Sequence, residues 1–129
     1  MIVLDKRYIN WCEVEQYVEE FAESNQYNEF SGVFGLPRGG LCLAVMLSHR
    51  LEIPLLSAPC EGCIIVDDIC DSGETLLHYL RNSSGIKKNN YTITTMIYKP
   101  NKLVPENYLV YGFKEVDERW IVFPWEKID

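Results

Sequence analysis

The chain has 129 residues, of which 47% are hydrophobic and 24% are charged, and its net charge is −7. This composition is typical of a globular protein, and we expect one domain over residues 1–129. No apolar run is long enough to cross a bilayer, and the charged N-terminal segment is unlike a targeting peptide. We therefore expect a cytoplasmic protein with no membrane partner. The acidic balance argues against a nucleic-acid partner, because such proteins usually carry a basic face.

The five cysteines are an odd number and lack the spacing of a small disulfide scaffold, so we expect free thiols. Cys60 and Cys63 form a lone CxxC pair. A structural zinc would need about four ligands, and only this pair is clustered. A thioredoxin-type pair stands at a helix start, whereas this one leads into a strand. We interpret it as two thiols at a turn and a strand edge.

The first clear element is a helix over residues 10–23. Asn10 is a good N-cap, and Glu13 three residues later completes a capping box. The apolar residues recur at helical spacing and predict a buried stripe. They are Trp11, Val14, Tyr17, Val18 and Phe21.

The elements that follow alternate between strand and helix. Helical spacing predicts helices over 41–51 and 72–81. Apolar or β-branched runs predict strands at 32–36, 53–56, 63–66, 91–98 and 108–111, followed by an aromatic ending at 119–126. This alternation predicts an α/β fold, a mostly parallel twisted sheet flanked by helices, with its site at the strand C-termini.

One connection does not fit this pattern. Only residues 57–62 join the second strand to the third, whereas a parallel crossover usually takes a dozen or more residues. The second strand is therefore very short, or it runs antiparallel, or the link descends in an extended form.

Residues 63–77 carry the strongest chemical signal. The buried strand is followed at once by Asp67 and Asp68, and then by the small-residue turn 71–75, Asp-Ser-Gly-Glu-Thr, before a helix. A buried strand, a small-residue turn and a helix start together form a phosphate cradle. The acidic pair beside the cradle suits a divalent metal or sugar hydroxyls.

Three stretches resemble the type I phosphoribosyltransferase family. Residues 66–76, Val-Asp-Asp-Ile-Cys-Asp-Ser-Gly-Glu-Thr-Leu, resemble its signature for phosphoribosyl pyrophosphate (PRPP). Residues 35–40, Gly-Leu-Pro-Arg-Gly-Gly, resemble its pyrophosphate loop. Tyr-Lys-Pro at 98–100 and Trp-Ile-Val-Phe-Pro-Trp-Glu at 120–126 resemble the xanthine–guanine branch. The resemblance implies the fold of that family, with a small C-terminal aromatic hood over the base.

The resemblance also implies a reaction and its cofactor. The reaction is Mg²⁺-dependent purine salvage, in which the 5-phosphoribosyl group of PRPP passes to guanine, xanthine or hypoxanthine. The products are the nucleoside monophosphate and pyrophosphate.

The resemblance assigns roles to the phosphate side. Residues Asp71 to Thr75 would form the PRPP-binding turn, in which Ser72, Gly73, Glu74 and Thr75 would hold the 5′-phosphate at the helix N-terminus. The carboxylates of Asp67 and Asp68 would face the ribose hydroxyls and the Mg²⁺ shell. Arg38 and Gly39 would contact pyrophosphate. The peptide bond that enters this arginine is often cis in the family.

The resemblance assigns the base side as well. Asp71 would take the N7 proton of the purine, Lys99 would donate to its 6-oxo group, and Trp120 would stack on its ring. The Ile121 backbone would read the 2-position edge. Simpler interpretations compete: Asp71 as a helix N-cap, Lys99 as a solvated strand end and Trp120 as a core residue. We expect Trp125 to be a packing residue, and His49 and His78 to be exposed or structural.

The sequence departs from the family at one place. The family usually carries a long mobile hood loop between the second and third strands, which excludes water from the reacting centre. Here residues 57–62 replace it. Without that loop, the chain could instead be a non-catalytic nucleotide- or PRPP-binding regulatory protein on the same fold, or a neighbouring subunit could cover the site. The surplus of aromatic residues would tolerate such an interface, and we expect a homo-oligomer, dimer or tetramer.

A receiver domain also uses an acidic pair and a Lys-Pro at strand ends. The order of the motifs opposes this interpretation, because here the acidic pair follows the third predicted strand and no acceptor aspartate precedes Lys99.

Overall fold

The computed structural model describes residues 5–82 and 90–126 of the chain. Its helices are α1 (Trp11–Ser24), α2 (Leu41–Leu51), α3 (Glu74–Asn82) and the 3₁₀ turn η1 (Glu106–Tyr108). Its strands are β1 (Lys6–Tyr8), β2 (Val33–Gly35), β3 (Ile64–Cys70), β4 (Thr92–Tyr98), β5 (Val110–Lys114) and β6 (Trp120–Val122).

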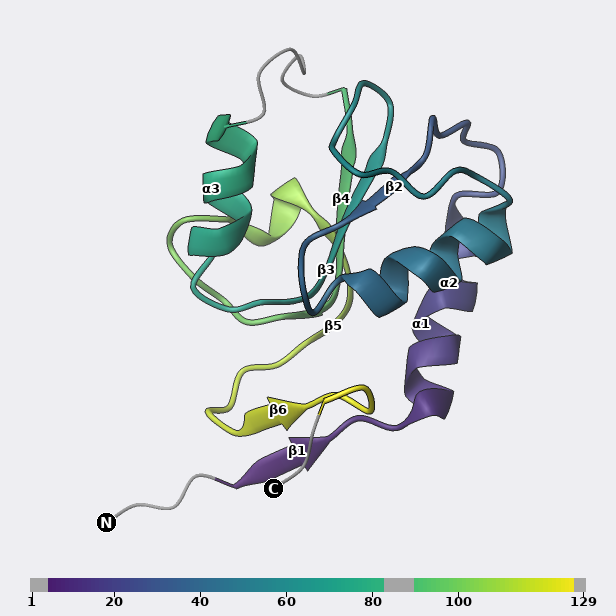
Figure 1. The fold of residues 1–129 in the computed structure, drawn as a ribbon. Helices are drawn as coiled ribbons and strands as arrows, with labels where there is room; N and C mark the ends of the chain where they lie inside the picture. Colours follow the sequence, from purple (N-terminus) through teal and green to yellow (C-terminus); the bar gives the residue numbers. More distant parts are fainter. Residues whose placement is uncertain (1–4, 83–89, 127–129) are drawn as a thin grey trace.

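The strands form two sheets. The main sheet has the order β2-β3-β4-β5, and all its neighbours are parallel. A separate small sheet pairs β1 with β6, also in parallel. Helices α1 and α2 lie on one side of the main sheet and α3 on the other (Figure 1). The predicted α/β architecture with a mostly parallel sheet is confirmed.

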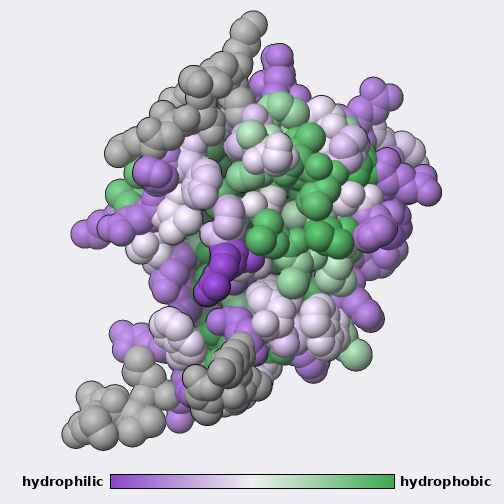
Figure 2. All heavy atoms as spheres, viewed as in Figure 1, coloured by the Kyte–Doolittle hydropathy of each residue, from purple (hydrophilic) through white to green (hydrophobic). Residues whose placement is uncertain are grey.

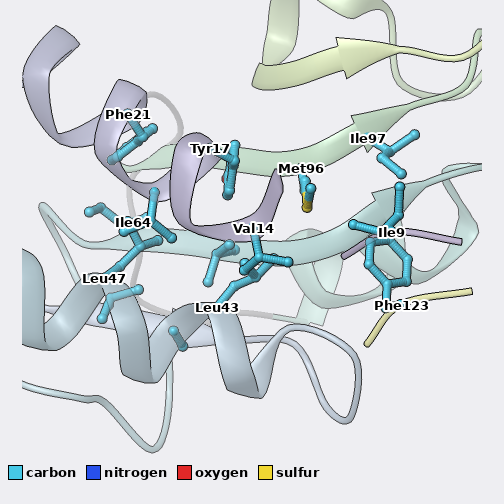
Figure 3. Close-up of a cluster of buried hydrophobic side chains, with 14 of the residues drawn as sticks. Ile9, Val14, Tyr17, Phe21, Leu43, Leu47, Ile64, Met96, Ile97 and Phe123 are labelled. Carbon is cyan, nitrogen blue, oxygen red and sulfur yellow. The ribbon is translucent and has the colours of Figure 1, made fainter. Parts of the chain in front are cut away.

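Strand β3 is buried on both faces, as its unbroken apolar run predicts. Ile64 and Val66 belong to the core cluster that includes side chains of α1 and α2, whereas Ile65 belongs to the cluster on the α3 side. Figure 3 shows the first cluster, in which Val14, Tyr17 and Phe21 of α1 gather with Leu43 and Leu47 of α2. Because both faces of β3 are anchored, its C-terminal end has a fixed position.

The predicted capping box of α1 is present. The Asn10 side chain accepts from the Glu13 N–H, and the Glu13 carboxylate accepts from the Asn10 N–H, both at 2.9 Å. Four of the five predicted stripe residues are buried. Trp11 is the exception, because it is 49% exposed and its ring lies 5.9 Å from that of Trp125 in the C-terminal segment.

The predicted second strand at 53–56 is not a strand. It makes one isolated parallel bridge, from Leu55 to Val33. The Val33 N–H donates to the Pro54 carbonyl at 2.9 Å, and the Leu56 N–H donates to the Val33 carbonyl at 2.8 Å. Because this bridge engages only the first residue of β2, six residues suffice to return to the start of β3. The parallel bridge excludes the antiparallel explanation for the short connection and agrees with a pairing that is very short.

Several boundaries also differ from the prediction. Strand β3 continues past residue 66 to Cys70, because β4 pairs with it over that whole length. Helix α3 begins at Glu74 rather than at residue 72, and β5 runs over 110–114 rather than 108–111. Strand β1 was not predicted. Its three residues carry no local signal, and they pair with β6, which is more than 100 residues away in the chain.

Two further features of the described residues bear on the sequence analysis. No helix in residues 5–82 or 90–126 is long and apolar enough to span a membrane. All five cysteines are free thiols, and the Cys63 N–H donates to the Cys60 carbonyl at 3.2 Å across a turn. This turn agrees with the interpretation of the CxxC pair.

A hydrophobic area covers part of one face. Figure 2, in the same view as Figure 1, shows hydrophobic residues gathered over the region of α2 and the segment that follows it. Leu41 and Val45 of α2, and Leu55 beyond it, are large hydrophobic residues with exposed side chains.

Candidate active site

A cleft of about 270 Å³ opens at the C-terminal ends of β2 and β3. Three segments line it: the loop after β2, the end of β3, and the turn that enters α3. The lining residues are Pro37, Gly39, Asp67, Asp68, Ile69, Cys70, Asp71, Ser72, Gly73, Thr75 and Leu76. Seven of the predicted site residues therefore meet in one cleft. Arg38 and Glu74 belong to the same loops, are exposed, and do not line it.

The two carboxylates at the end of β3 are half-buried and adjacent. Asp67 accepts from the Asp68 N–H at 2.9 Å, and Asp68 accepts from the Ile69 N–H at 2.8 Å. Burial and the neighbouring Asp68 charge raise the pKa of Asp67 to about 8. Burial also raises the pKa of Asp68, and the charge of Glu126 adds to this shift. Two desolvated carboxylates side by side form a site that favours a cation or hydroxyl donors.

The loop after β2 approaches this pair through its backbone. The Pro37–Arg38 peptide bond is cis, as the resemblance implies. A Cβ atom on Gly39 would lie 2.2 Å from an oxygen of Asp68, so only glycine leaves that carboxylate in place. The Leu36 N–H donates to the Val66 carbonyl at 2.9 Å, which fixes the start of the loop beside β3. The predicted pyrophosphate loop thus lies directly against the acidic pair.

The turn into α3 lines the cleft with Ser72, Gly73 and Thr75. Gly73 has φ +84°, and its carbonyl accepts from the Leu77 N–H at 3.0 Å, which makes it the N-cap of α3. The Ser72 hydroxyl accepts from the Glu74 N–H at 3.3 Å. A helix N-terminus at a cleft favours an anion, because its first N–H groups lack partners within the helix.

Asp71 is exposed and lines the same cleft, two residues before this N-cap. The N-cap interpretation of Asp71 is therefore wrong, because Gly73 occupies that position. The Asp71 carboxylate remains available to the cleft.

Lys99 follows β4, and Trp120 is the first residue of β6. The Lys99 N–H donates to the Cys70 carbonyl at 2.8 Å, which places Lys99 next to Asp71. Its ammonium donates to the Arg119 carbonyl at 3.1 Å. An ammonium has three donors, so two remain for a ligand. Because Arg119 precedes Trp120 in the chain, this bond connects the two predicted base contacts.

The Trp120 side chain is 61% exposed, so its interpretation as a core residue is wrong. The backbone N–H of Trp120 donates to the Asp5 carbonyl at 3.0 Å, and the Val122 carbonyl accepts from the Ile9 N–H at 2.8 Å. Backbone groups alternate in direction along a strand, so those of Ile121 face away from β1. Within residues 5–82 and 90–126 the small sheet consists of β1 and β6, and no third strand of this part pairs with the Ile121 backbone groups.

The neighbouring Trp125 is a packing residue, as predicted. Its ring stacks on Phe123 with centroids 5.0 Å apart and an interplanar angle of 10°. The contrast between Trp120 and Trp125 defines which of the two rings a ligand could reach.

The acidic pair fits a magnesium ion that takes its remaining ligands from elsewhere. In residues 5–82 and 90–126, no group of three or more His, Cys, Asp and Glu side chains could hold a metal alone. Mg²⁺ usually binds one or two carboxylates and completes its shell with water and substrate phosphates. Asp67 and Asp68, half-buried and at raised pKa, are such a donor set.

Two neighbours of the site, Asn101 and Glu126, were not predicted from the sequence. Asn101 contacts Lys99, Cys70 and the turn after them. Asparagine just after a strand end is a common turn residue, and that signal could have identified it. Glu126 is near enough to Asp68 to affect its pKa, and no local pattern indicates this contact.

The short segment that replaces the hood loop lies at the other end of the sheet. The Ser31 hydroxyl donates to the Glu61 carbonyl at 2.7 Å, and the Gly62 N–H donates to the Asn90 carbonyl at 2.6 Å. Residues 31, 62 and 90 all precede the strands β2, β3 and β4. In Figure 1 this connection is at the top, whereas the loop from β3 to α3 runs below α3, toward the opposite end of the main sheet. The described chain therefore provides no lid from this connection.

The sequence pattern of the phosphoribosyl transferase domain matches residues 59–127, which is just over half of the chain. This stretch includes the acidic pair, the cradle, Lys99 and Trp120. The chain belongs to the phosphoribosyltransferase family.

Relatives of this phosphoribosyltransferase agree with the assignment. The xanthine-guanine phosphoribosyltransferase of Idiomarina loihiensis is 23% identical over 145 residues, covering 92% of this chain and 86% of that protein. The structure of a purine phosphoribosyltransferase from Pyrococcus horikoshii superimposes with a TM-score of 0.80 at 29% identity, covering 98% and 97% of the two chains. The xanthine-guanine-hypoxanthine phosphoribosyltransferase of Helicobacter pylori has the same fold, with a TM-score of 0.69 at 18% identity and coverage of 94% and 93%.

Proposed function

We propose that this phosphoribosyltransferase serves purine salvage. It would transfer the 5-phosphoribosyl group of PRPP to a 6-oxopurine, namely guanine, xanthine or hypoxanthine, and release the nucleoside monophosphate and pyrophosphate. The observation that carries the proposal is the single cleft in which the acidic pair, the α3 N-terminus and Asp71 meet, with Lys99 adjacent. The names of the relatives support the substrate class.

Substrate binding follows from the two loops. The N–H groups of Ser72 to Thr75, with the Ser72 and Thr75 hydroxyls, bind the 5′-phosphate at the helix N-terminus. Arg38 and the Gly39 backbone contact pyrophosphate beside Asp68. The carboxylates of Asp67 and Asp68 accept hydrogen bonds from the ribose hydroxyls. Together these contacts hold the sugar with its reacting carbon toward the purine.

The base binds between the end of β4 and β6. Lys99 donates to the 6-oxo group, the exposed ring of Trp120 stacks on the purine, and the outward-facing Ile121 backbone reads the 2-position edge. As N9 of the purine bonds to the sugar carbon, the bond from that carbon to pyrophosphate breaks and its electron pair leaves with pyrophosphate. The Asp71 carboxylate accepts the N7 proton, and it returns this proton in the reverse reaction.

Mg²⁺, bound at Asp67 and Asp68, would neutralise the negative charge of the leaving pyrophosphate. The raised pKa of Asp67 supports this role, because a cation beside the pair would restore the ionised form.

A second candidate function is nucleotide or PRPP binding without turnover, as a regulatory protein. The position of residues 57–62 at the far end of the sheet favours it, because a site without this lid excludes water less well. The same site residues would then bind the nucleotide and catalyse nothing.

One assay separates the two functions. The protein is mixed with PRPP, Mg²⁺ and, in turn, guanine, xanthine, hypoxanthine or adenine, and nucleotide and pyrophosphate are followed. We expect turnover with at least one 6-oxopurine and little with adenine, and no turnover when EDTA removes Mg²⁺. Binding of PRPP or GMP by calorimetry, without turnover on any base, would establish the regulatory function instead.

The proposal extends to location and assembly. Five free thiols are typical of a reducing compartment, in keeping with a cytoplasmic enzyme. The exposed hydrophobic residues Leu41, Val45 and Leu55 support a homo-oligomer, dimer or tetramer. Sedimentation analysis of the wild type and of Val45→Glu tests this. A wild type that sediments as a monomer would contradict it.

A further inference from the structure

Asn101, in the loop after β4, uses every hydrogen-bonding group of its side-chain amide. The nitrogen donates to the Lys99 carbonyl at 3.0 Å and to the Cys70 sulfur at 3.6 Å. The oxygen accepts from the N–H groups of Leu103 at 3.1 Å and Val104 at 2.8 Å. The two ends of the amide thus serve two different parts of the site.

The Asn101 oxygen stabilises a turn that packs against the phosphate cradle. It closes the turn 101–104, and this turn packs against Gly73. A Cβ atom on Gly73 would lie 2.8 Å from the Asn101 oxygen, 3.0 Å from a Val104 methyl carbon and 3.2 Å from the Leu103 Cβ. The Tyr98 hydroxyl donates to the Val104 carbonyl at 2.6 Å and holds the far end of the turn. The N-cap of α3 therefore touches this turn directly.

The nitrogen holds the backbone from which the Lys99 side chain departs. The Lys99 carbonyl accepts from Asn101, while the Lys99 N–H donates to the Cys70 carbonyl. The peptide groups on both sides of Lys99 are thereby fixed relative to the end of β3. The Lys99 ammonium then reaches the Arg119 carbonyl beside Trp120.

We propose that Asn101 is a positioning residue that sets the spacing between the phosphate cradle and the base contact of Lys99. This inference rests on the proposed function, because it assigns phosphate to the cradle and a purine to Lys99. The spacing matters because the purine and the sugar carbon must be held at about 3–3.5 Å before they react. The contacts of the amide oxygen support PRPP binding at the cradle, and those of the amide nitrogen support purine binding at Lys99.

Two variants of Asn101 separate the effect of the oxygen contacts from that of the nitrogen contacts. Asn101→Ala removes both, and we expect the KM for PRPP and the KM for guanine each to rise about tenfold, the effect of one or two lost hydrogen bonds. Asn101→Ser keeps a hydroxyl that can close the turn, although more weakly, and it lacks the amide nitrogen. With Asn101→Ser we expect the KM for guanine to rise and the KM for PRPP to stay within about twofold of wild type.

Ser48→Ala is the matched control. The Ser48 hydroxyl donates to the Ile53 carbonyl at 2.6 Å, so the variant also loses a side-chain bond to a loop carbonyl, away from the cleft. We expect Ser48→Ala to lower the melting temperature and to leave both KM values unchanged. Unchanged KM values in Asn101→Ala, an equal rise in Ser48→Ala, or equal rises for PRPP in the Ala and Ser variants would overturn the role of Asn101.

The outcome remains distinguishable from failure of the proposed function. If the wild type binds PRPP and GMP without turnover, the enzyme assignment fails. The dissociation constants of PRPP and GMP, measured by calorimetry, then replace the two KM values, and the same split is expected. If the wild type binds neither, both the function and the role of Asn101 are overturned.

Discussion

The two ends of the main sheet each carry a glycine in the left-handed region, and they differ in what surrounds it. Gly62, in the turn before β3, has φ +78°, and Gly73, after β3, has φ +84°. A Cβ on Gly62 would meet only Ser31, at 3.6 Å or more, whereas one on Gly73 would meet three atoms at 2.8–3.2 Å. The same backbone requirement therefore occurs once in an open turn and once in a closely packed one.

The closely packed end of the main sheet is the end that carries the candidate site. The packed end carries the acidic pair, the helix N-terminus and the Asn101 turn, all held by short backbone contacts. The open end carries the segment that replaces the hood loop. The site therefore depends on a rigid backbone cradle, and closure over the ligand, where it occurs, must come from other parts of the molecule.

The largest expected effect comes from removing the proton acceptor at the packed end. Asp71→Asn should lower kcat by roughly 10²–10⁴, the usual range for an acid–base group, and leave the KM for PRPP unchanged. Steady-state kinetics with guanine checks this. Glu61→Gln, which removes a carboxylate at the open end, is the control and should turn over as wild type. An unchanged rate in Asp71→Asn would show that Asp71 is not the proton acceptor.

The two glycines provide the most direct test of the comparison. Gly73→Ala adds a methyl group against Asn101 and should raise the KM for PRPP by at least about tenfold. Gly62→Ala puts alanine at a similarly unfavourable φ and should lower the free energy of unfolding by about 1–2 kcal/mol. It should leave the KM for PRPP unchanged. Kinetics and urea unfolding of both variants check this. Equal effects on KM would mean that close packing does not distinguish the two ends.

The two tryptophans of the C-terminal segment should also separate binding from packing. Trp120→Leu removes an exposed ring and should raise the KM for guanine about two- to twelvefold, the value of an aromatic contact of ~0.5–1.5 kcal/mol, with little change in melting temperature. Trp125→Leu removes a ring stacked on Phe123 and should mainly lower the melting temperature. The reverse pattern would assign the base contact to Trp125.

A pH dependence of stability is expected in the ligand-free protein. Because the pKa of Asp67 is raised to about 8, the folded state binds more protons than the unfolded state between about pH 4 and pH 8. The free energy of unfolding should therefore fall as the pH rises through this window. Urea unfolding in EDTA checks this, and Asp67→Asn should flatten the slope.

Asp117→Asn is the control for this measurement. Its contacts with Arg119 lower the pKa of the Asp117 carboxyl, so its contribution is present above about pH 4 and is lost only at lower pH. The slope above pH 5 should persist in this variant. A slope that also persists in Asp67→Asn would assign it to another group.

The sequence by itself determined the parts of this protein that depend on local chemistry. The capping box of α1 was visible because Asn10 and Glu13 are three residues apart. Strand β3 and the turn after it were visible because an apolar run, two carboxylates and small residues follow one another in the chain. The connection at 57–62 is visibly short in the sequence, because its length is the number of residues between two predicted strands.

The tertiary structure alone decided the features that depend on distant partners. Strand β1 exists because β6 pairs with it, and the raised pKa of Asp67 arises from burial by the assembled fold. Asn101 contacts Cys70 and Gly73, which come from another part of the chain, so only the fold gives this residue its partners. The physical reason is common to all three: hydrogen bonding, desolvation and close packing act between atoms that meet in space, and the local pattern of a chain does not record those meetings.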